Sequence, residues 1–528
     1  MVSVGKLGLL IPVLLFITVA NLMGAEQSAV EYPFRNGAEF VAVGKIDEML
    51  MNSLVIKGIQ PANLCSDEVF IRRVFLDMTG TLPESWETTA FLKSQNSNKR
   101  RVLINRLMER EAFVDFWTFK WCDLLRVKAE YPINLWPNGV QAYARWIHEA
   151  VKYNMPYDQF ARELLTSSGS NFRVPPVNFY RAIQGEEPSA IAAAVALTFM
   201  GTRIEKWPEE KRAQLENVFS RVAFKHTAEW KEVIVHVDPA QTEPLQAIFP
   251  DGKTVTVRPE SDPRVTFADW LITPDNDWFS RNVCNRIWSW FMGRGIIHEP
   301  DDIRADNLAV YPEILTFLQE ELYKSKYDLR HIFRLILTSS AYQQSCIPSS
   351  KDSQAETLFA HYPVRRLDAE VLVDAICWLT GTQEEYSSVI PEPFTFIPAT
   401  QSTVKLVDGS ITSPLLKMFG RPERDTGLEA ERSNEVSDGQ RLHLLNSTHI
   451  KSKIERGLRL KQLLAQNRGR IDQMTRQIYL LTLSRNPTKD EMQVAAELFN
   501  VKARRKNRQA AIDLIWALIN SKEFLYRH

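Results

Sequence analysis

Cysteine is scarce, and the few cysteines do not stand in a spacing that would make a local cofactor site. The chain of 528 residues has five of them, Cys65, Cys122, Cys284, Cys346 and Cys377. No two are separated by only two residues, so the sequence-local signature of a zinc site, a redox pair or a covalently attached haem is missing. We therefore expect no cofactor and no metal.

Charge of one sign is also missing, because Lys and Arg together number 64 and Asp and Glu together number 64. Proteins that bind nucleic acids or anionic membranes need a basic excess. The nine histidines form no H-x-x-x-H pair, and no P-loop, dinucleotide-binding or nucleophile-elbow motif occurs. The sequence therefore predicts no nucleic-acid partner, names no reaction and does not decide whether the protein is an enzyme.

Long apolar runs are confined to the N-terminus. Lys6 precedes an apolar run over Leu7–Ala20, and the residues that follow are typical of a cleavage region. The pattern predicts a signal peptide over residues 1–25, and hence export to the periplasm or the cell envelope. An uncleaved anchor stays an alternative, although Pro12 and the short length disfavour a membrane span. No later run is long enough to cross a bilayer, so we expect no transmembrane span in the mature chain.

What the chain does have is helical periodicity over most of its length, which predicts a mainly α fold. An apolar helix should begin near Phe279 and end at Gly293, and another should follow Asp368. Short β-strands are expected at 233–237, 247–249 and 254–257, and an irregular surface loop at 381–413. We predict two multi-helix domains, at 44–232 and 264–526, with a small β-hairpin insertion at their junction over 233–263.

Several segments resemble a known family when they are taken together. In the first predicted domain these are Asp67–Pro83, Lys99–Leu107 and Asn154–Phe160. In the second they are Phe267–Leu271, Arg281–Arg304, Tyr327–Leu329, Pro363–Glu370, Phe419–Arg424 and His443–Ser447. The chain resembles the planctomycete-type two-domain family in which a cytochrome-associated (PSCyt-type) domain precedes a PSD-type domain. The resemblance implies a setting in the cell envelope, with polysaccharide or redox partners, more than it implies a reaction.

Two departures from the family pattern concern cysteine. Family members often carry a Cys-x-x-Cys-His segment after a helix like Thr198–Ile204, but here Ile204-Glu205 runs directly into Lys206-Trp207. Many members also have a Cys-x-Cys pair where this chain reads Leu428–Ser433. Covalent haem needs two thiols and an adjacent histidine. The resemblance thus implies a member that has lost the family's haem motif.

The first group of candidate site residues lies around the tryptophan-rich helix. Asp301 and Asp302 follow this helix and could form a carboxylate pair for acid–base chemistry. The alternative is an ion-pair role, because Arg286 should be partly buried on the helix and would need an acidic partner. We favour the ion-pair role for these aspartates.

Two further groups carry dense charge. One possibility is an anion site at a helix N-terminus, formed by Arg365, Arg366, Asp368 and Glu370. We favour a different interpretation, in which Asp368 is the N-cap of the helix and Glu370 interacts with the helix dipole. The run from Arg421 to Glu435 is typical of a solvated surface. Its alternative is an ion-pair lattice that lines a groove, with these ligand-contact candidates: Arg421, Glu431, Arg432, His443 and Asn446.

These patterns favour a non-catalytic role. We expect an exported binding or assembly component of a periplasmic system, with other periplasmic proteins or polysaccharide as partners. The main alternative is a cofactor-free hydrolase of polysaccharide that would use Asp301, Asp302, Glu431 or His443. An electron-transfer protein with a non-covalently bound cofactor is a third hypothesis.

Overall fold

Helices dominate the fold, as the spacing of apolar residues predicts. The computed structural model of the protein describes residues 34, 38–467, 469–500 and 507–528. Helices hold about 52% of the chain and strands about 5%, which confirms the mainly α prediction. The predicted signal peptide at 1–25 lies outside the described residues.

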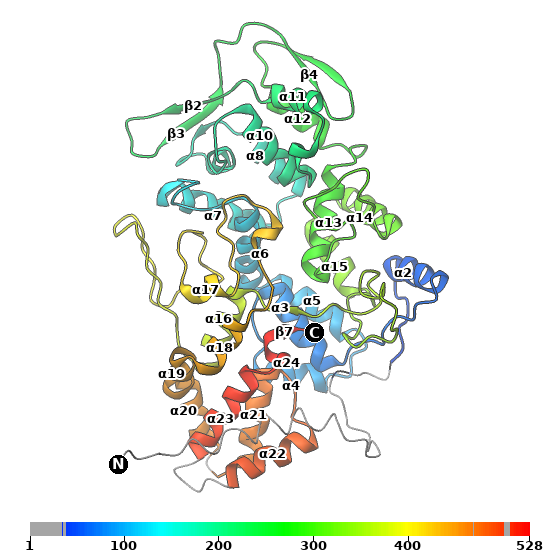
Figure 1. Ribbon diagram of the computed structural model, residues 1–528, viewed down its shortest axis with the longest axis vertical. Coiled ribbons are helices and arrows are strands. Elements are labelled where there is room, and N and C mark those ends of the chain that lie inside the picture. The colour runs from blue at the N-terminus through cyan, green and yellow to red at the C-terminus, as the bar shows by residue number, and fades with distance from the viewer. Residues whose placement is uncertain (1–33, 35–37, 468, 501–506) are drawn as a thin grey trace, which may run out of the picture. The chain divides into compact units, whose positions relative to one another are not determined.

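Helices fill most of the N-terminal segment (Figure 1). They are α2 (Lys45–Ile56), α3 (Asp67–Thr79), α4 (Ser85–Lys93), α5 (Lys99–Met108), α6 (Glu111–Leu124), α7 (Trp136–Lys152), α8 (Tyr157–Thr166), α9 (Asn178–Arg181), α10 (Pro188–Val195) and α11 (Glu209–Val218). Three short turns join them, η1 (Pro175–Val177), the π-helical η2 (Ala196–Met200) and η3 (Ile204–Lys206). The Ser66 hydroxyl caps α3, and Gly80 ends it in the left-handed conformation.

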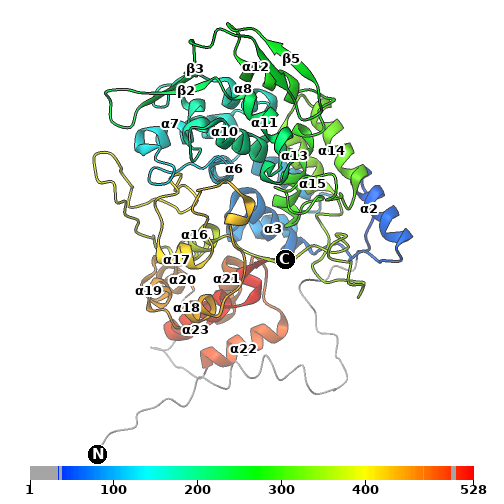
Figure 2. The ribbon, with the colours of Figure 1, turned by 45° about the horizontal axis from the view of Figure 1, so that its top comes forward.

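The predicted β-strands are present, and further strands that include β1 and β2 were not predicted. A three-stranded antiparallel sheet has the order β1–β3–β2, and β4 pairs with β5 in a hairpin. The strands are β1 (Gly169–Ser170), β2 (Val222–His226), β3 (Val233–Val237), β4 (Leu245–Ile248) and β5 (Thr254–Val257). The three predicted strands are confirmed within two residues. Helix α11 packs on both α10 and β4 (Figures 1 and 2).

The C-terminal segment is again helical. Its helices are α12 (Pro263–Leu271), α13 (Phe279–Met292), α14 (Pro312–Lys324), α15 (Leu329–Thr338), α16 (Ala369–Thr380), α17 (Pro414–Met418), α18 (Asp438–Asn446), α19 (Thr448–Arg456), α20 (Leu458–Gln466), α21 (Ile471–Leu483), α22 (Lys489–Asn500), α23 (Asn507–Ile519) and α24 (Lys522–Leu525). The turn η4 (Glu429–Glu431) precedes α18, and the short strand β6 (Arg365–Arg366) pairs antiparallel with β7 (Tyr526–Arg527). Helix α13 ends at Gly293, as predicted.

The segment at 381–413 has neither helix nor strand, as predicted, but it is not wholly a surface loop. Val404, Leu406 and Ile411 are buried, and Asp374 of α16 accepts hydrogen bonds from the backbone of Thr403 and Val404. The periodicity of apolar residues cannot predict this burial, because the segment has no helix or strand and its buried residues follow no regular spacing.

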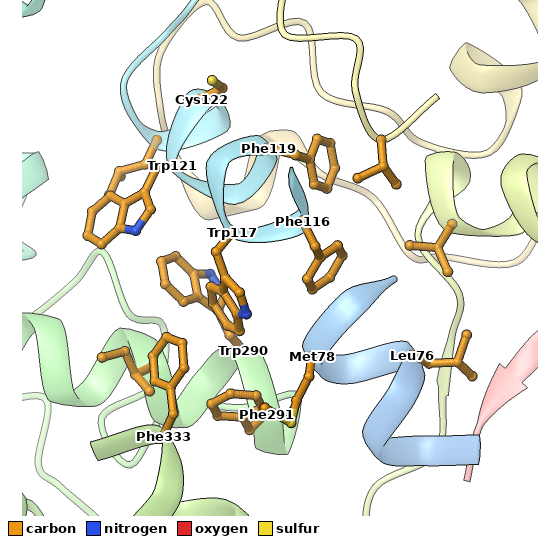
Figure 3. Packing of buried hydrophobic residues seen from close by; sticks show 14 of the residues in the cluster. Leu76, Met78, Phe116, Trp117, Phe119, Trp121, Cys122, Trp290, Phe291 and Phe333 are labelled. Atoms are coloured by element: carbon orange, nitrogen blue, oxygen red, sulfur yellow. The ribbon is translucent and has the colours of Figure 1, made fainter. Parts of the chain in front are cut away.

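One hydrophobic core serves both segments. Trp117 of α6 packs against Phe333 of α15 and against Trp290 and Phe291 of α13, with ring centroids 4.3, 5.4 and 5.4 Å apart (Figure 3). Met78 of α3 joins the same cluster (Figure 3). Residues 34–528 form one compact unit. The boundaries of the two domains stay predictions.

None of the described helices is both long and apolar enough to span a bilayer. All five cysteines are free thiols, and four of them are buried.

Candidate functional site

A cavity of about 270 Å³ opens beside the shared core, and charged residues of both segments gather at it. Two other cavities have the same volume, but only this one joins the charged motifs singled out from the sequence. We call it the central cavity. Its lining includes three aromatic residues, four cations and five carboxylates: Phe116, Trp117, Trp290, Lys120, Arg365, Arg432, Arg527, Asp77, Glu299, Asp301, Asp368 and Glu429.

Asp77 stands on the last turn of α3, where it anchors one part of the lining. It accepts hydrogen bonds from the hydroxyls of Tyr342 (2.8 Å) and Tyr362 (3.1 Å). It also pairs with Arg365 and Arg527, each at 3.1 Å. The β6–β7 pairing sets these two arginines directly opposite each other, so both side chains lie on the same face and reach one carboxylate.

Asp368 occupies the N-cap position of α16, but its side chain does not cap the helix. The carboxylate instead pairs with Lys120 of α6 at 3.0 Å and with Arg527 at 3.2 Å. Burial alone would raise the pKa of Asp368, but the charges of Lys120, Arg527 and Arg432 outweigh it and hold that pKa well below its usual range. The prediction that Asp368 caps the helix is therefore wrong. Its side chain instead pairs with two cations that are distant in sequence, Lys120 and Arg527.

Glu370 was expected to interact with the dipole of α16, but it is fully buried in ion pairs. It pairs with Arg432 at 2.7 Å and with Arg421 at 3.3 Å. Asp123 of α6 pairs with Arg432 at 2.6 Å and with Arg424 at 2.7 Å. Burial raises the pKa of Asp123, but the nearby charges of Arg432 and Arg424 lower it overall.

The run from Arg421 to Glu435 is therefore not a solvated surface throughout. Arg421, Arg424 and Arg432 have side chains that are at most 7% exposed, and each is held by a carboxylate. We define the ion-pair network as ten residues: Asp77, Lys120, Asp123, Arg365, Asp368, Glu370, Arg421, Arg424, Arg432 and Arg527.

Arg286 has the acidic partner that its burial requires. It pairs with Asp301 at 2.5 Å and lies 3.6 Å from Glu429. The backbone N–H of Glu429 donates to Asp301 at 2.6 Å, and the indole N–H of Trp290 donates to the Glu429 carboxylate at 3.2 Å. Asp302 points elsewhere, to Lys206 and Arg304, so the two aspartates do not form a catalytic pair.

The other candidate residues lie outside the central cavity. Arg366 donates to the carbonyls of Phe419 (2.6 Å) and Ser433 (2.9 Å), which fastens the segment that carries the arginines of the run. Asn446 and His443 lie on α18. Burial lowers the pKa of His443, and the neighbouring His449 lowers it further.

Glu431 borders a smaller adjacent pocket of about 20 Å³. Its carboxylate accepts from the backbone N–H groups of Asp425 (2.9 Å) and Thr426 (3.0 Å). Burial raises the pKa of Glu431, although these donors oppose the rise.

Sequence reasoning did not single out Asp77, Lys120, Asp123 or Arg527. A local signal existed for Asp77 and Asp123, because each is a carboxylate inside a strongly apolar helix and would need a partner when buried. Arg527 had no such signal, since its partners lie far away along the chain.

One group of side chains in the described residues has the spacing of a metal site. Glu111, Asp115 and His148 have ligand atoms within 4.8 Å of one another. However, Lys405 pairs with Asp115 at 2.9 Å and Lys152 lies 3.7 Å from Glu111, so both carboxylates already have cationic partners. A covalently held haem does not fit, because the chain offers no paired cysteines with an adjacent histidine.

Comparison with known proteins agrees with the order of the segments. Residues 45–229 match the PSCyt2 model, a protein of unknown function (DUF1549), and residues 263–499 match the PSD1 model, a protein of unknown function (DUF1553). Searches among curated proteins and among solved structures found no match. The chain belongs to the two-domain family in which a PSCyt-type domain is followed by a PSD-type domain.

Proposed function

We propose that this chain is a binding protein whose central cavity holds a small carbohydrate-like ligand. The cavity volume of about 270 Å³ is close to the lower end of ligand pockets, about 300–1,000 Å³, which suits a monosaccharide or disaccharide. Aromatic rings of Trp117 and Trp290 supply flat apolar surface, and the ionised side chains around them supply fixed donors and acceptors for hydroxyl groups.

One observation carries this proposal, which is that polar atoms along the lining lack partners. The indole N–H of Trp117 is buried without a hydrogen-bond acceptor among the described residues. The same holds for the Nε of Arg365, and the Oδ1 of Asn434 lacks a donor there. Buried polar atoms without a partner also occur elsewhere in the described residues, but these three share one cavity, where a polar ligand would give each of them a partner.

Two features favour binding over hydrolysis. Hydrolysis by a carboxylate pair needs one carboxylic acid with a raised pKa. In the central cavity Asp368 has a strongly lowered pKa, so it cannot donate a proton near neutral pH. The charged side chains of the network are also fixed in ion pairs, which suits recognition more than proton transfer.

The hydrolase alternative has one observation in its favour. Glu431 has a pKa that burial raises, and its pocket shares Lys120, Trp290, Glu429 and Arg432 with the central cavity. Glu431 could therefore act as a general acid on a ligand that reached both pockets.

A single titration series tests both functions. The full chain is titrated with mono- and oligosaccharides of plant and algal polysaccharides, with tryptophan fluorescence as the readout, and the same mixtures are assayed for hydrolysis. We expect saturable quenching without turnover, because Trp117 and Trp290 line the cavity. Turnover that is abolished in a folded Glu431→Gln variant would establish the hydrolase instead.

The proposal extends to location and partners. An exported chain of this kind would act as a binding or assembly component of a periplasmic or envelope system, in contact with polysaccharide or other periplasmic proteins. Lys6 and the apolar run over Leu7–Ala20 support export. Cell fractionation with N-terminal sequencing of the mature chain tests it, and an intact cytoplasmic chain that begins at Met1 would contradict it.

A further inference from the structure

The ion-pair network contains more cations than carboxylates. Four carboxylates, Asp77, Asp123, Asp368 and Glu370, are shared by six cations, Lys120, Arg365, Arg421, Arg424, Arg432 and Arg527. Each carboxylate serves two cations, so the network keeps two positive charges that no carboxylate within it balances.

This excess is buried. None of the ten side chains is more than 17% exposed, and Arg424 and Glu370 are fully buried. Uncompensated charge in a protein interior is unfavourable, because water no longer solvates it. A network of this kind is stabilised by any anion that can reach it.

The adjoining charges do not remove the excess. Arg286 lies between Asp301 and Glu429, which gives one cation for two carboxylates. Arg366 then adds a cation whose hydrogen bonds go only to carbonyl oxygens. Asp374 of α16 adds one more carboxylate, on which the charge of Glu370 acts, so eight cations face seven carboxylates and one positive charge still remains. Glu299 does not change this balance, because Arg203 pairs with it at 2.6 Å.

The excess charge is accessible from one place. Lys120, Arg365, Arg432 and Arg527 line the central cavity, whereas Arg421 and Arg424 do not. An anion within the cavity would lie beside four of the six cations, where the local dielectric is low and charge-assisted hydrogen bonds are strong. It would also lie beside five carboxylates, each of which already has a cationic partner.

We propose that the ligand of the central cavity is a sugar that carries an oxyanion, either the carboxylate of a sugar acid or a sulfate ester. This inference rests on the proposed function and names its ligand class. The oxyanion would take the place of the missing carboxylates beside Lys120 and the three arginines. Hydroxyl groups of the same ligand would donate to Glu299, Asp301 and Glu429, which are the remaining carboxylates of the lining.

Calorimetric titration of the full chain separates this inference from the proposed function. The probes are galacturonate, a sulfated galactose, neutral galactose and inorganic sulfate, all at the same ionic strength. We expect one or both charged sugars to bind about 10- to 100-fold more tightly than galactose, which is the usual gain from hydrogen bonds between charged groups. Whichever of the two binds more tightly identifies the oxyanion.

Each of the other outcomes contradicts the oxyanion inference, the proposed carbohydrate-binding function, or both. Equal affinity for galactose and both charged sugars would overturn the oxyanion inference but leave the proposed function standing. No binding by any sugar, with none by sulfate, would overturn both. Inorganic sulfate that binds as tightly as the charged sugars would support the oxyanion and contradict the carbohydrate ligand.

A matched pair of lysine variants gives an independent readout. Lys120 lines the cavity, and its side chain is 11% exposed; Lys128 is 10% exposed, pairs with Asp425 at 2.6 Å and does not line the cavity. We expect Lys120→Gln to weaken binding of the charged sugar about tenfold and binding of the neutral sugar by a clearly smaller factor. Lys128→Gln should change neither affinity.

A charge-preserving variant guards against a merely structural effect. Lys120→Arg should keep the preference for the charged sugar, since it keeps the positive charge. If Lys120→Gln fails to fold, the salt dependence of binding to the wild-type protein still tests the oxyanion inference. Its affinity for the charged sugar must fall as the salt concentration rises, while its affinity for galactose must not. A preference that survives in folded Lys120→Gln, or that ignores salt, would contradict the inference.

Discussion

Two buried clusters of charge in this protein differ in their balance. Near the C-terminal helices, Arg485 pairs with Glu491 at 2.7 Å and with Glu523 at 2.6 Å. Arg72 lies nearby, and the charge of Glu523 acts on it. This cluster therefore has two cations for two carboxylates, and none of its residues lines the central cavity. The ion-pair network has six cations for four carboxylates, and the cavity opens on it.

The comparison teaches how to tell a structural cluster from a binding site. A balanced cluster satisfies its own charges, so its role is to hold helices together. An unbalanced cluster beside a cavity is incomplete without a ligand. Charge balance, not the number of ion pairs, is what distinguishes the two regions.

The largest effect should come from removing a carboxylate from the unbalanced network. Asp368→Asn leaves Lys120 without a carboxylate partner, although Arg527 keeps Asp77, and we expect a loss of about 3–5 kcal/mol in the free energy of unfolding. Glu491→Gln in the balanced cluster should cost only about 1 kcal/mol, because Arg485 keeps Glu523. Urea denaturation of both variants measures the difference. Equal losses would refute the distinction between the clusters.

The turn that holds the charged run should be the next most sensitive feature. Gly420 has a φ of +81°, and a Cβ there would clash with the carbonyl oxygen of Ser433. We expect Gly420→Ala to cost about 2–3 kcal/mol. Gly252 has a φ of +87° but no atom within 4 Å of such a Cβ, so Gly252→Ala should cost about 1 kcal/mol from backbone strain alone. Thermal unfolding of the two variants measures both losses, and their difference gives the effect of the clash with Ser433. Similar losses of stability in the two variants would mean that this clash is unimportant.

Acid should weaken the unbalanced network through its carboxylates. The pKa of Asp368 is well below its usual value in the folded protein, so its contribution is present above the unfolded pKa of about 3.9 and is lost as pH falls through the folded value. We expect the free energy of unfolding to fall progressively as pH drops below about 4. Urea midpoints across this range measure the loss. The urea midpoint should depend less steeply on pH in Asp368→Asn than in the wild-type protein. An equally steep dependence would show that Asp368 does not contribute to the loss at low pH.

The smallest effect should come from the candidates that lie outside the cavity. Asn446→Ala and His443→Ala alter α18, whose residues do not line the central cavity. We expect sugar affinity to stay unchanged in both, as measured by fluorescence titration. A clear loss in either variant would extend the binding site to α18.

Local features of this protein could be predicted from its sequence. Helix α13, its end at Gly293 and strands β3, β4 and β5 follow from periodicity and turn residues. The pairing of Arg286 with Asp301 was also foreseeable, because the two residues are only 15 positions apart and a buried arginine needs an acid.

Non-local features could not be predicted. Asp77 meets Arg365 across 288 positions, and nothing near Asp77 in the sequence indicates that partner. For the same reason Asp368 resembles an ordinary N-cap until Lys120 and Arg527 are placed beside it. The run at 421–432, whose arginines are buried, resembles a solvated segment because composition alone does not show what packs over it.

The most direct test of this account is the calorimetric comparison of galacturonate and sulfated galactose with galactose on the full chain. We predict that at least one charged sugar binds about 10- to 100-fold more tightly than the neutral one, and that Lys120→Gln removes most of this preference. Indistinguishable affinities for charged and neutral sugars in the wild-type protein would contradict the claim that the cavity compensates a buried excess of cations.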